Sequence, residues 1–353
     1  MFSMRDLAAE VEGSTELLRA EVAGDVARAA ELLGAGRLVA FPTETVYGLG
    51  ASALDRAAVA KIFAAKGRPG WDPLIVHVDG PEMLRQVAVL PTGAEGRIVA
   101  KLIGAFWPGP LTMLLPRTAT VPDAITAGRA LVGVRMPAHP VALELIGRAR
   151  VPIAAPSANR FGHTSPTSAA HVLADLDGRI DAVLDGGETS VGVESTVLDV
   201  AARVIYRPGA VTAEMISQVI GEEVRIVLKS SSAVETAAPE ALASPGMGIR
   251  HYAPRARLVL VAGERELLNE VSRYAAEVGV MLPDGWSLPE GCSAGAVFGW
   301  GKWDDAETLA QRLFAGLRDL DERGVKVIVC PMPVAGGLRD ALRDRLEKAA
   351  RVK

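Results

Sequence analysis

One break in the hydrophobic pattern limits the possible folds of this chain more than any other feature. Residues 229–254, KSSSAVETAAPEALASPGMGIRHYAP, are rich in Ser, Ala and Pro and follow neither a helical nor a strand period. Such a composition predicts a linker. On both sides of it, short apolar runs alternate with helical patterns, which is typical of α/β domains. With 353 residues, the chain also exceeds the usual size of one core, so we expect two domains.

The expected boundaries follow from this break. Residues 1–22 form a lead-in in which Leu17, Leu18 and Val22 hint at a helix. The first domain covers residues 23–221, the linker 222–256, and a small second domain 257–353. In the first domain we expect strands at residues 38–41, 74–78, 111–115, 131–135, 153–155, 182–184, 196–200 and 204–206, and helices at 25–36, 55–66, 94–106, 140–149 and 168–176. In the second we expect strands at 257–261, 280–282 and 325–330, and helices at 265–278, 304–323 and 338–350.

Composition and charge exclude several classes of protein. Apolar residues make up 49% and charged residues 23% of the chain, so it can bury a core and is not globally disordered. The net charge of −4 argues against a broad nucleic-acid surface, which is usually basic. Cys292 and Cys330 form no CxxC pair, which is typical of reduced thiols. Since we also find no signal peptide and no apolar run of about 18 residues, we expect a cytoplasmic protein away from membranes.

Three familiar ligand-binding motifs are absent from the sequence. There is no G-x-x-x-x-G-K-[ST] segment, so an ATP site would need another architecture than the P-loop. The segment GAGRLV at residues 34–39 lacks the third glycine of a Rossmann fingerprint and precedes a strand instead of following one. The histidines do not have metal-ligand spacing. We therefore expect no protein-held metal and no organic prosthetic group.

Polar side chains instead gather where predicted strands end, which is where α/β sheets usually bind ligands. The segment FPTETVYGLGA supplies Thr45, although a hydrophilic turn would explain it equally. A glycine- and proline-rich loop carries Lys66 and Arg68 after a helix, where the helix dipole alone already favours cations. His77 interrupts an apolar strand, and such a histidine is more often a satisfied core residue than a ligand. Arg135 ends another apolar run and needs a carboxylate or an anionic ligand as its partner.

The remaining candidates lie in three later segments. VPIAAPSANRFGHTSPT supplies hydroxyl and amide groups, GVESTVLDV supplies a further hydroxyl, and VIYRPGA supplies another cation. The side chains concerned are those of Ser157, Asn159, Ser165, Ser195 and Arg207. Hydroxyls and four cations at strand ends of one domain have the composition of an anion-binding crevice.

These segments also carry a resemblance to a known family. PTETVYGL, KGRP, PLIVHV, WPGPLT, VRMPAHP, PIAAPSANRFG, SPT, GVEST and YRPG occur in the order found in the YrdC-type family. PGMGIRHYAP and the small domain after it resemble the longer, two-domain form of that family. The motifs cover roughly residues 24–260, and the last domain is matched mainly by its position.

The resemblance implies a fold and an activity. The fold would be a YrdC-like, twisted mixed-sheet α/β domain followed by a smaller, Rossmann-like α/β domain. The activity would be that of a nucleotidyltransferase, L-threonylcarbamoyladenylate synthase, which condenses L-threonine, bicarbonate and ATP and releases pyrophosphate, with Mg²⁺ accompanying the ATP. A separate transferase would use the product to modify tRNAs that read ANN codons. Stable binding of tRNA by this chain itself is not expected.

The resemblance also implies roles for individual residues. The L-threonine pocket would be lined by Thr45, His77, Arg135, Ala155 and Ser195. ATP would be bound by Lys66, Arg68, Asp72, Ala130, Ser157, Asn159, Ser165, Arg207 and Tyr252. No enzyme nucleophile is needed, so Lys66, Arg68 and Arg207 would act by positioning and by neutralising charge.

Two positions depart from the family pattern. Asp72 replaces the usual Asn, and Ala130 replaces the usual Thr. An Asp beside ATP would repel phosphate unless it acts through magnesium or a bound water. Tyr252 belongs to the linker and has two interpretations. It either packs the second domain onto the first or closes over the substrates as a lid.

Two other functions are compatible with a domain of this kind. One is a module that binds double-stranded RNA, against which the acidic composition counts. The other is a carbamoyltransferase of the hydrogenase-maturation type. Proteins of that type add zinc-finger cysteines and an acylphosphatase-like segment, and this chain has neither.

Overall fold

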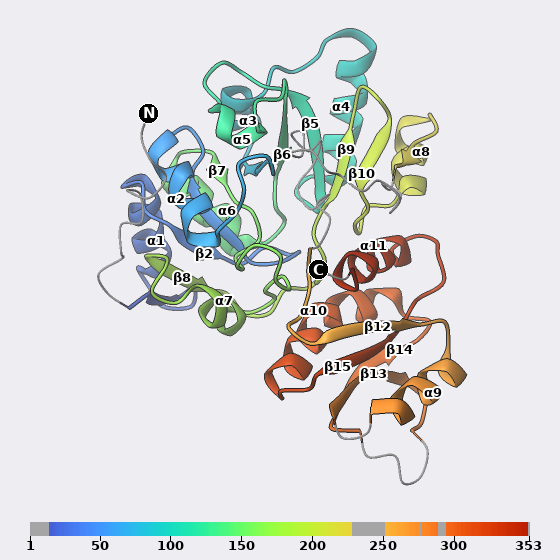
Figure 1. Ribbon diagram of the computed structural model, residues 1–353. Helices are drawn as coiled ribbons and strands as arrows, with labels where there is room; N and C mark the ends of the chain where they lie inside the picture. The colour runs from blue at the N-terminus through green and yellow to red at the C-terminus, as the bar shows by residue number, and fades with distance from the viewer. Residues whose placement is uncertain (1–13, 228–250, 275–276, 289–293, 352–353) are drawn as a thin grey trace.

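The computed structural model describes residues 14–227, 251–274, 277–288 and 294–351. In these ranges the chain forms two α/β regions, each built around its own sheet (Figure 1). A sheet of 11 strands lies in the first region and a sheet of four strands in the second. The expectation of two sheets on either side of residues 229–254 is therefore met. Most of the linker, residues 228–250, and most of the lead-in, residues 1–13, lie outside the described residues.

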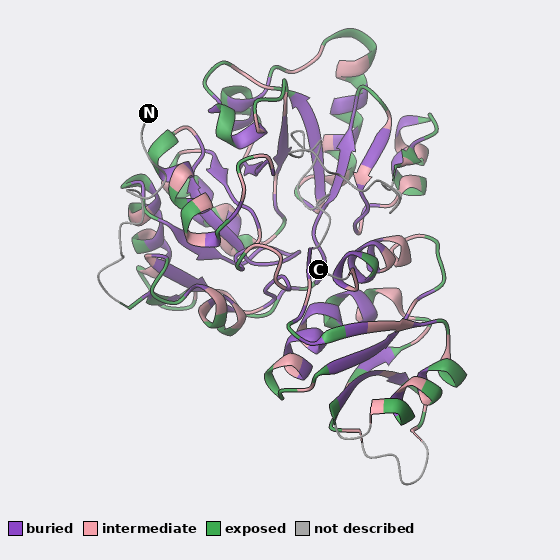
Figure 2. Cartoon of the chain, viewed as in Figure 1, coloured by how far each residue is buried: buried purple, intermediate pink, exposed green. Residues whose placement is uncertain are grey.

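The first sheet is mixed and has the strand order β1-β8-β2-β3-β7-β4-β6-β5-β9-β10-β11. Its strands are β1 (Glu16–Arg19), β2 (Val39–Phe41), β3 (Gly48–Ser52), β4 (Ile75–His77), β5 (Leu111–Pro116), β6 (Leu131–Arg135), β7 (Ile153–Ala154), β8 (Ala182–Asp185), β9 (Thr196–Asp199), β10 (Val204–Arg207) and β11 (Arg225–Ile226). Its helices are α1 (Asp25–Gly34), α2 (Arg56–Lys66), α3 (Pro81–Val87), α4 (Gly93–Phe106), α5 (Asp123–Thr126), α6 (Pro140–Ala149), α7 (Ala169–Leu176) and α8 (Ala213–Ile220). Most strand residues are buried, because helices cover the sheet (Figure 2).

The pairing of the central strands decides where the polar strand ends meet. β4 runs parallel to β6, and the register places His77 opposite Arg135. β7 runs antiparallel to β4, with Ile153 opposite His77. The ends of β4 and β6 therefore lie beside the start of β7, and the segment that follows β7, which carries Ser157, runs past the start of β4.

The second sheet consists of β12 (Arg257–Val261), β13 (Val278–Asp284), β14 (Ala296–Lys302) and β15 (Val327–Pro331), and its helices are α9 (Glu264–Tyr274), α10 (Ala306–Glu322) and α11 (Arg339–Ala349). All its pairs are parallel, in the order β12-β15-β13-β14. In a Rossmann fold the first two strands are neighbours, whereas here β15 lies between β12 and β13. The α/β class is thus confirmed, but the closer likeness to a Rossmann fold is not.

All strands predicted for the first domain are present, within a few residues of their expected bounds. The helix hinted at in the lead-in is wrong, because Glu16–Arg19 is strand β1 and pairs with β8 at the edge of the sheet. Strands β3, β11 and β14 are not among the predicted strands, and β3 is the glycine-rich segment GLGAS. Since β1 and β11 belong to the first sheet, that sheet extends beyond residues 23–221 at both ends.

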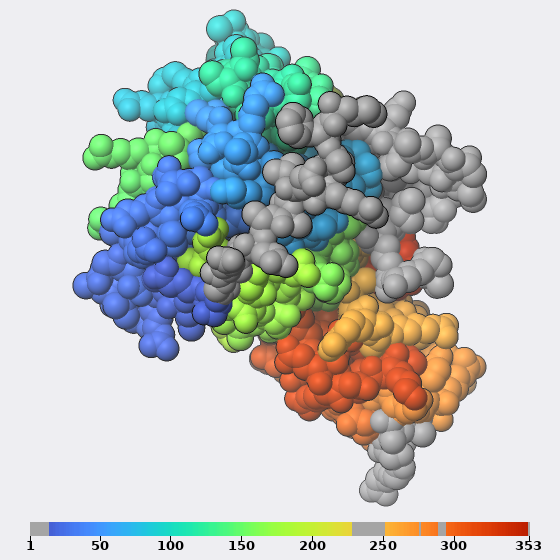
Figure 3. Space-filling model, turned by 60° about the vertical axis from the view of Figure 1, so that its left-hand side comes forward, coloured from blue at the N-terminus to red at the C-terminus, as the bar shows by residue number. Residues whose placement is uncertain are grey.

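The two regions pack closely against each other, as two lobes joined along one side (Figure 3). Val46 and Val193 of the first region share an apolar cluster with Leu313 and Phe314 of α10. Gly192 lies so close to α10 that an added Cβ would come within 2.3 Å of the Gln311 Cα. The contact between the domains therefore has the tight packing of a protein core.

This close approach predicts the effect of Gly192→Ala. Gly192 has a φ of +80°, and a side chain in that region costs about 1–2 kcal/mol by itself. The Gln311 backbone must also move, so we expect the stability to fall by more than this amount and the two domains to separate. Gly187→Ala is the matched control, since Gly187 has a φ of +87° but no atom within 4 Å of an added Cβ. Thermal unfolding and limited proteolysis would measure both variants, and equal melting temperatures would contradict this account of the interface.

Candidate active site

A cavity opens where the ends of the central strands meet the second region. Its lining residues are Thr43, Thr45, Val46, Gly48, Arg68, Ile75, His77, Arg135, Ala155, Pro156, Ser157, Glu194, Ser195, Arg207, His251 and Tyr252. The cavity volume is about 40 Å³, and about 520 Å³ of space lies between these side chains when the open solvent at its mouth is counted. All the residues expected to bind L-threonine line this cavity, and so do four of those expected to bind ATP: Arg68, Ser157, Arg207 and Tyr252.

Arg135 is held in the cavity wall by a carboxylate of the protein. Its Nη2 donates to the Glu44 Oε2 at 2.7 Å, and its Nη1 donates to the Thr45 Oγ1 at 2.9 Å. The Ala138 backbone N–H also donates to Glu44 Oε2, at 3.2 Å. Of the two partners considered for Arg135, the structure thus shows the protein carboxylate. The Arg135 Nε has no hydrogen-bond partner among the described residues, so the guanidinium keeps N–H donors for a ligand.

Arg68 leaves α2 through a left-handed turn and is paired at once. Asp55 begins the helix by accepting from the N–H groups of Ala57 and Ala58, and Gly67 ends it at a φ of 62°. Arg68 Nη2 then lies 3.0 Å from the Asp72 Oδ2, and its Nε donates to the Asp72 carbonyl at 3.1 Å. Asp72, which departs from the family pattern, therefore has a structural role, because its carboxylate forms an ion pair with Arg68.

Lys66 lies behind the cavity wall and does not line the cavity. Its ammonium donates to the Ser157 carbonyl at 2.5 Å and to the Asn159 carbonyl. Burial lowers the pKa of the Lys66 ammonium well below its usual value, with the neighbouring Arg68 charge as the next cause. Lys66 therefore holds the loop after β7 in place, a role that the sequence does not suggest.

Four other expected ATP contacts are also absent from the cavity lining: Asp72, Ala130, Asn159 and Ser165. Asn159 donates to the carbonyls of Arg160 and His163, and Ser165 donates to the Glu194 Oε1 at 2.5 Å. Ala130 is exposed and precedes β6. Since a strand rises about 3.3 Å per residue, it lies on the order of 16 Å from Arg135, which ends that strand. For these residues the roles in ATP binding stay predictions.

Arg207 and Ser195 form one polar unit on β9 and β10. Arg207 Nε donates to the Ser195 carbonyl at 3.0 Å, and its Nη2 donates to the Ser195 Oγ at 3.1 Å. The Ser195 Oγ also lies 2.8 Å from the Thr112 Oγ1. Burial lowers the pKa of Arg207, and the β9–β10 register shifts between Ile205 and Arg207.

The end of the linker enters the same cavity. His251 and Tyr252 are 4% and 1% exposed and stack edge-on at 4.3 Å between ring centroids. The Tyr252 ring also stacks on Phe314 of α10 at 5.7 Å. Tyr252 has a φ of 64°, which is uncommon for a residue other than glycine. It therefore packs the domains together and lines the cavity at once, which fits the first interpretation of Tyr252, while its closure as a lid stays a prediction.

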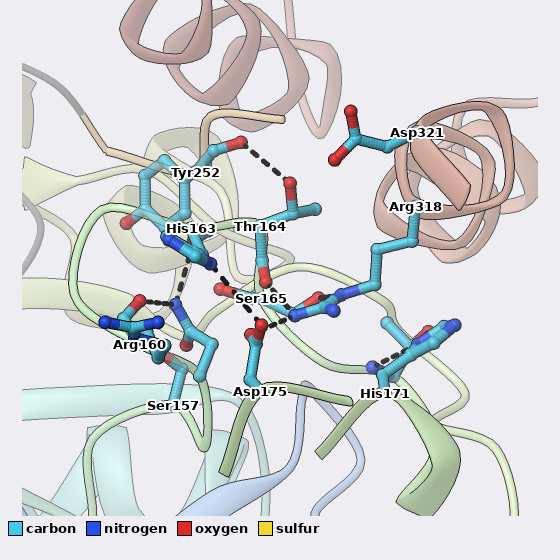
Figure 4. Close-up of polar contacts among 12 residues, drawn as sticks. Ser157, Arg160, His163, Thr164, Ser165, His171, Asp175, Tyr252, Arg318 and Asp321 are labelled. Carbon is cyan, nitrogen blue, oxygen red and sulfur yellow. Dashed lines mark hydrogen bonds and ion pairs between the residues drawn. The ribbon is translucent and has the colours of Figure 1, made fainter. Parts of the chain in front are cut away.

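A second cavity, of about 310 Å³, lies at the seam between the domains. Arg318 of α10 reaches across this seam to the Asp175 Oδ2 at 2.7 Å and to the Thr164 carbonyl (Figure 4). Thr164 in turn donates to the Tyr252 carbonyl at 3.4 Å. In the same cavity, Arg255 pairs with Asp321 of α10 at 3.1 Å. These charges satisfy one another, so we interpret the second cavity as part of the domain contact.

Neither a metal cluster nor a membrane-spanning helix is found in the described part of the chain. Within the described ranges, no three His, Cys, Asp or Glu side chains gather in a way that could hold a metal ion. No helix in that part of the chain has the length and apolarity needed to cross a bilayer.

Comparison with known proteins agrees with this geometry. The profile of the family described as "Telomere recombination" (Sua5, YciO and YrdC) matches residues 31–209, and that of "Threonylcarbamoyl-AMP synthase, C-terminal domain" matches residues 211–351. The threonylcarbamoyl-AMP synthase of Pyrococcus abyssi is 45% identical, over 91% of this chain and 93% of its own length. That of Bacillus subtilis is 43% identical, over 92% of each chain. A crystal structure of P. abyssi Sua5 with L-threonine has a TM-score of 0.84 and 44% identity, and covers 95% of this chain and 97% of that one.

The chain therefore belongs to the threonylcarbamoyl-AMP synthase family, in its two-domain form. This membership confirms the predicted fold, a YrdC-like domain followed by a second α/β domain. It also confirms the predicted synthase activity, of nucleotidyltransferase type, over the RNA-binding and hydrogenase-maturation alternatives.

The state of His77 predicts a pH dependence of stability. Burial, and then the Arg135 charge, lower the pKa of His77 to about 3, whereas an unfolded histidine has a pKa of about 6.5. Between about pH 3 and pH 6.5, His77 is protonated in the unfolded chain but neutral in the folded one. The contribution of this group to the free energy of unfolding is therefore complete above about pH 6.5 and is lost as the pH falls. The loss from this group is roughly 2 kcal/mol at pH 5. Denaturant unfolding of wild type and His77→Gln at pH 7 and pH 5 should show the smaller loss in the variant, and equal losses would contradict a neutral, buried His77.

Proposed function

We propose that the cavity between the central strand ends and Tyr252 binds L-threonine and ATP together and forms threonylcarbamoyl-AMP. The observation that carries this proposal is the convergence of three guanidinium groups on one cavity, those of Arg68, Arg135 and Arg207. The two substrates bring a carboxylate and a triphosphate, and guanidinium groups are suited to both. Family membership supports the same pair of substrates.

In this proposal the L-threonine end is formed by Thr45, His77, Arg135, Ala155 and Ser195. Arg135 would bind the carboxylate through N–H groups that Glu44 and Thr45 leave unused, while Glu44 holds the guanidinium in place. His77 is neutral at physiological pH, and its Nδ1 has no partner among the described residues. An imidazole in that state can accept a hydrogen bond from a substrate hydroxyl or amine.

The nucleotide end would lie between Arg68, Ser157, Arg207 and Tyr252. Arg68 and Arg207 would neutralise phosphate charge in a site that excludes much of the water, where such interactions are strong. Lys66 would act on the nucleotide through the loop whose carbonyls it binds. Mg²⁺ would come with ATP, since magnesium is usually held by substrate phosphates, waters and one or two carboxylates. Both Glu194 oxygens already accept from protein groups, Ser165 and Arg345, so the phosphates and waters would hold the ion.

The reaction then needs no nucleophile from the protein. The threonine amine attacks bicarbonate and water leaves, which gives a carbamate. A carbamate oxygen attacks the α-phosphorus, the bond from that phosphorus to the bridging oxygen breaks, and pyrophosphate leaves with the electron pair. The side chains contribute orientation of the carbamate and neutralisation of the developing charge.

The product would serve a separate enzyme in the cytoplasm. A mixed anhydride of this kind is an activated acyl group, so a transferase must consume it to modify the tRNA. The net charge of −4 is consistent with a chain that does not hold tRNA stably itself.

The first test is the substrate dependence of pyrophosphate release. We expect release from ATP only when L-threonine and bicarbonate are both present, because the nucleophile is the carbamate they form. A coupled pyrophosphate assay with each substrate omitted in turn measures this. Equal release without threonine would contradict the proposal.

Arginine substitutions test the two ends of the cavity separately. Arg207→Ala removes a charge-assisted contact to phosphate, which is typically worth about 1.5–3 kcal/mol, so kcat/KM for ATP should fall about 10–100-fold. Arg135→Lys replaces a planar fork by a point charge and should raise the Kd of threonine more than that of ATP. Calorimetric titration of both ligands measures the difference, and equal losses for the two would contradict this division of the cavity.

A further inference from the structure

The second domain places a fully buried arginine beside the cavity. Arg345, on α11, is 0% exposed, and a guanidinium without solvent must be paired. Its Nε donates to the Glu194 Oε2 at 2.7 Å, and its Nη2 donates to the Pro208 carbonyl at 3.0 Å. A helix of the second domain thus contacts the two segments of the first that carry Ser195 and Arg207.

Glu194 is an unexpected residue in a cavity for anions. It lines the cavity and is 6% exposed. Its Oε1 accepts a hydrogen bond from the Ser165 Oγ at 2.5 Å, and its Oε2 accepts the one from Arg345. A carboxylate that lacked the Arg345 charge would repel a triphosphate at this depth, because charges interact strongly where water is excluded.

Arg207 is the cation that would otherwise turn to Glu194. Glu194 and Arg345 both lie near enough to shift the pKa of Arg207, in opposite directions. Arg207 instead donates to Ser195, through both its carbonyl and its hydroxyl. Pairing of Glu194 with Arg345 therefore leaves Arg207 in the cavity wall.

We propose that Arg345 is a positioning residue for the nucleotide site, which neutralises Glu194 and so preserves the positive charge that Arg207 offers to phosphate. The C-terminal domain thereby sets the charge of the cavity without touching the substrate. This inference rests on the proposed binding of ATP in the cavity.

The neighbouring charges on α11 make the proposal testable by charge balance. Asp344 accepts from Arg345 at 2.6 Å and also pairs with Lys348 at 2.8 Å. Glu194, Arg345, Asp344 and Lys348 together carry no net charge. Arg345→Met leaves Asp344 with Lys348 and Glu194 without a cation. Adding Glu194→Gln to that variant restores the balance.

The experiment measures the Kd of magnesium-ATP by calorimetry for full-length variants. We expect about 10- to 100-fold weaker binding in Arg345→Met, and recovery to within a few-fold of wild type in the double variant with Glu194→Gln. Glu194→Gln alone should bind ATP at least as tightly as wild type, and Arg345→Lys should keep most of the affinity. Arg343→Met is the matched control on α11, because the hydrogen bonds of Arg343 to described residues go to Pro333 and Glu347, both in the second domain. It should bind ATP as wild type does.

Three results would overturn the inference. If the double variant binds ATP as weakly as Arg345→Met, Arg345 acts only through domain packing. If Glu194→Gln alone weakens binding, the Glu194 charge is needed and not merely tolerated, and this holds even if Arg345→Met fails to fold. If Arg345→Met binds normally while Arg207→Ala does not, the inference fails but the proposed site stands. Normal binding in both would contradict the site as well.

Discussion

The burial of arginines around one cavity is the constraint on which the rest of this structure depends. Three such guanidinium groups each have a carboxylate within 3.0 Å, in the pairs Arg68–Asp72, Arg135–Glu44 and Arg345–Glu194. Removing one partner of a buried pair typically costs about 3–5 kcal/mol, because a charge is left without compensation. The carboxylates thus keep cations in a dry wall, where they bind anions more strongly than they would in water.

The second domain belongs to this arrangement and is more than an appendage. It contributes Phe314 to the packing of Tyr252 and Arg345 to the pairing of Glu194. The Arg345 guanidinium also lies 5.2 Å from the centre of the Tyr252 ring, within the range of a cation–π contact. Polar and apolar contacts of the domain interface therefore converge on the wall of the cavity.

Much of the first domain could be predicted, because its strands are short apolar runs and many of its cavity-lining residues follow strand ends. His77 and Arg135 meet because β4 and β6 are parallel neighbours in register. The pattern could not reveal β3, since its glycines and small residues give no apolar period. Strand β1 resembles a helical turn because four residues are too few to show alternation.

The ion-pair partners are the part of the site that the sequence analysis missed. Glu44 and Glu194 stand inside the PTET and GVEST motifs, but nothing in a motif says which cation an acid will meet. Arg345 lies on a charged helix that looks like a solvated face, and its partner is in the other domain. A motif also does not give distances. The motif that contains Ala130 predicts a place near ATP, whereas the length of β6 separates Ala130 from the cavity.

In the proposed reaction, L-threonine, bicarbonate and ATP combine into one product in this cavity. The most direct measurement is mass spectrometry of the adenylate formed from ATP, L-threonine and ¹³C-labelled bicarbonate. We expect an adenylate that carries both the threonine and the label, formed about 10–100-fold more slowly by Arg207→Ala. An adenylate that contains threonine but no label would contradict the account, since the carbamate would then not be the group that attacks ATP.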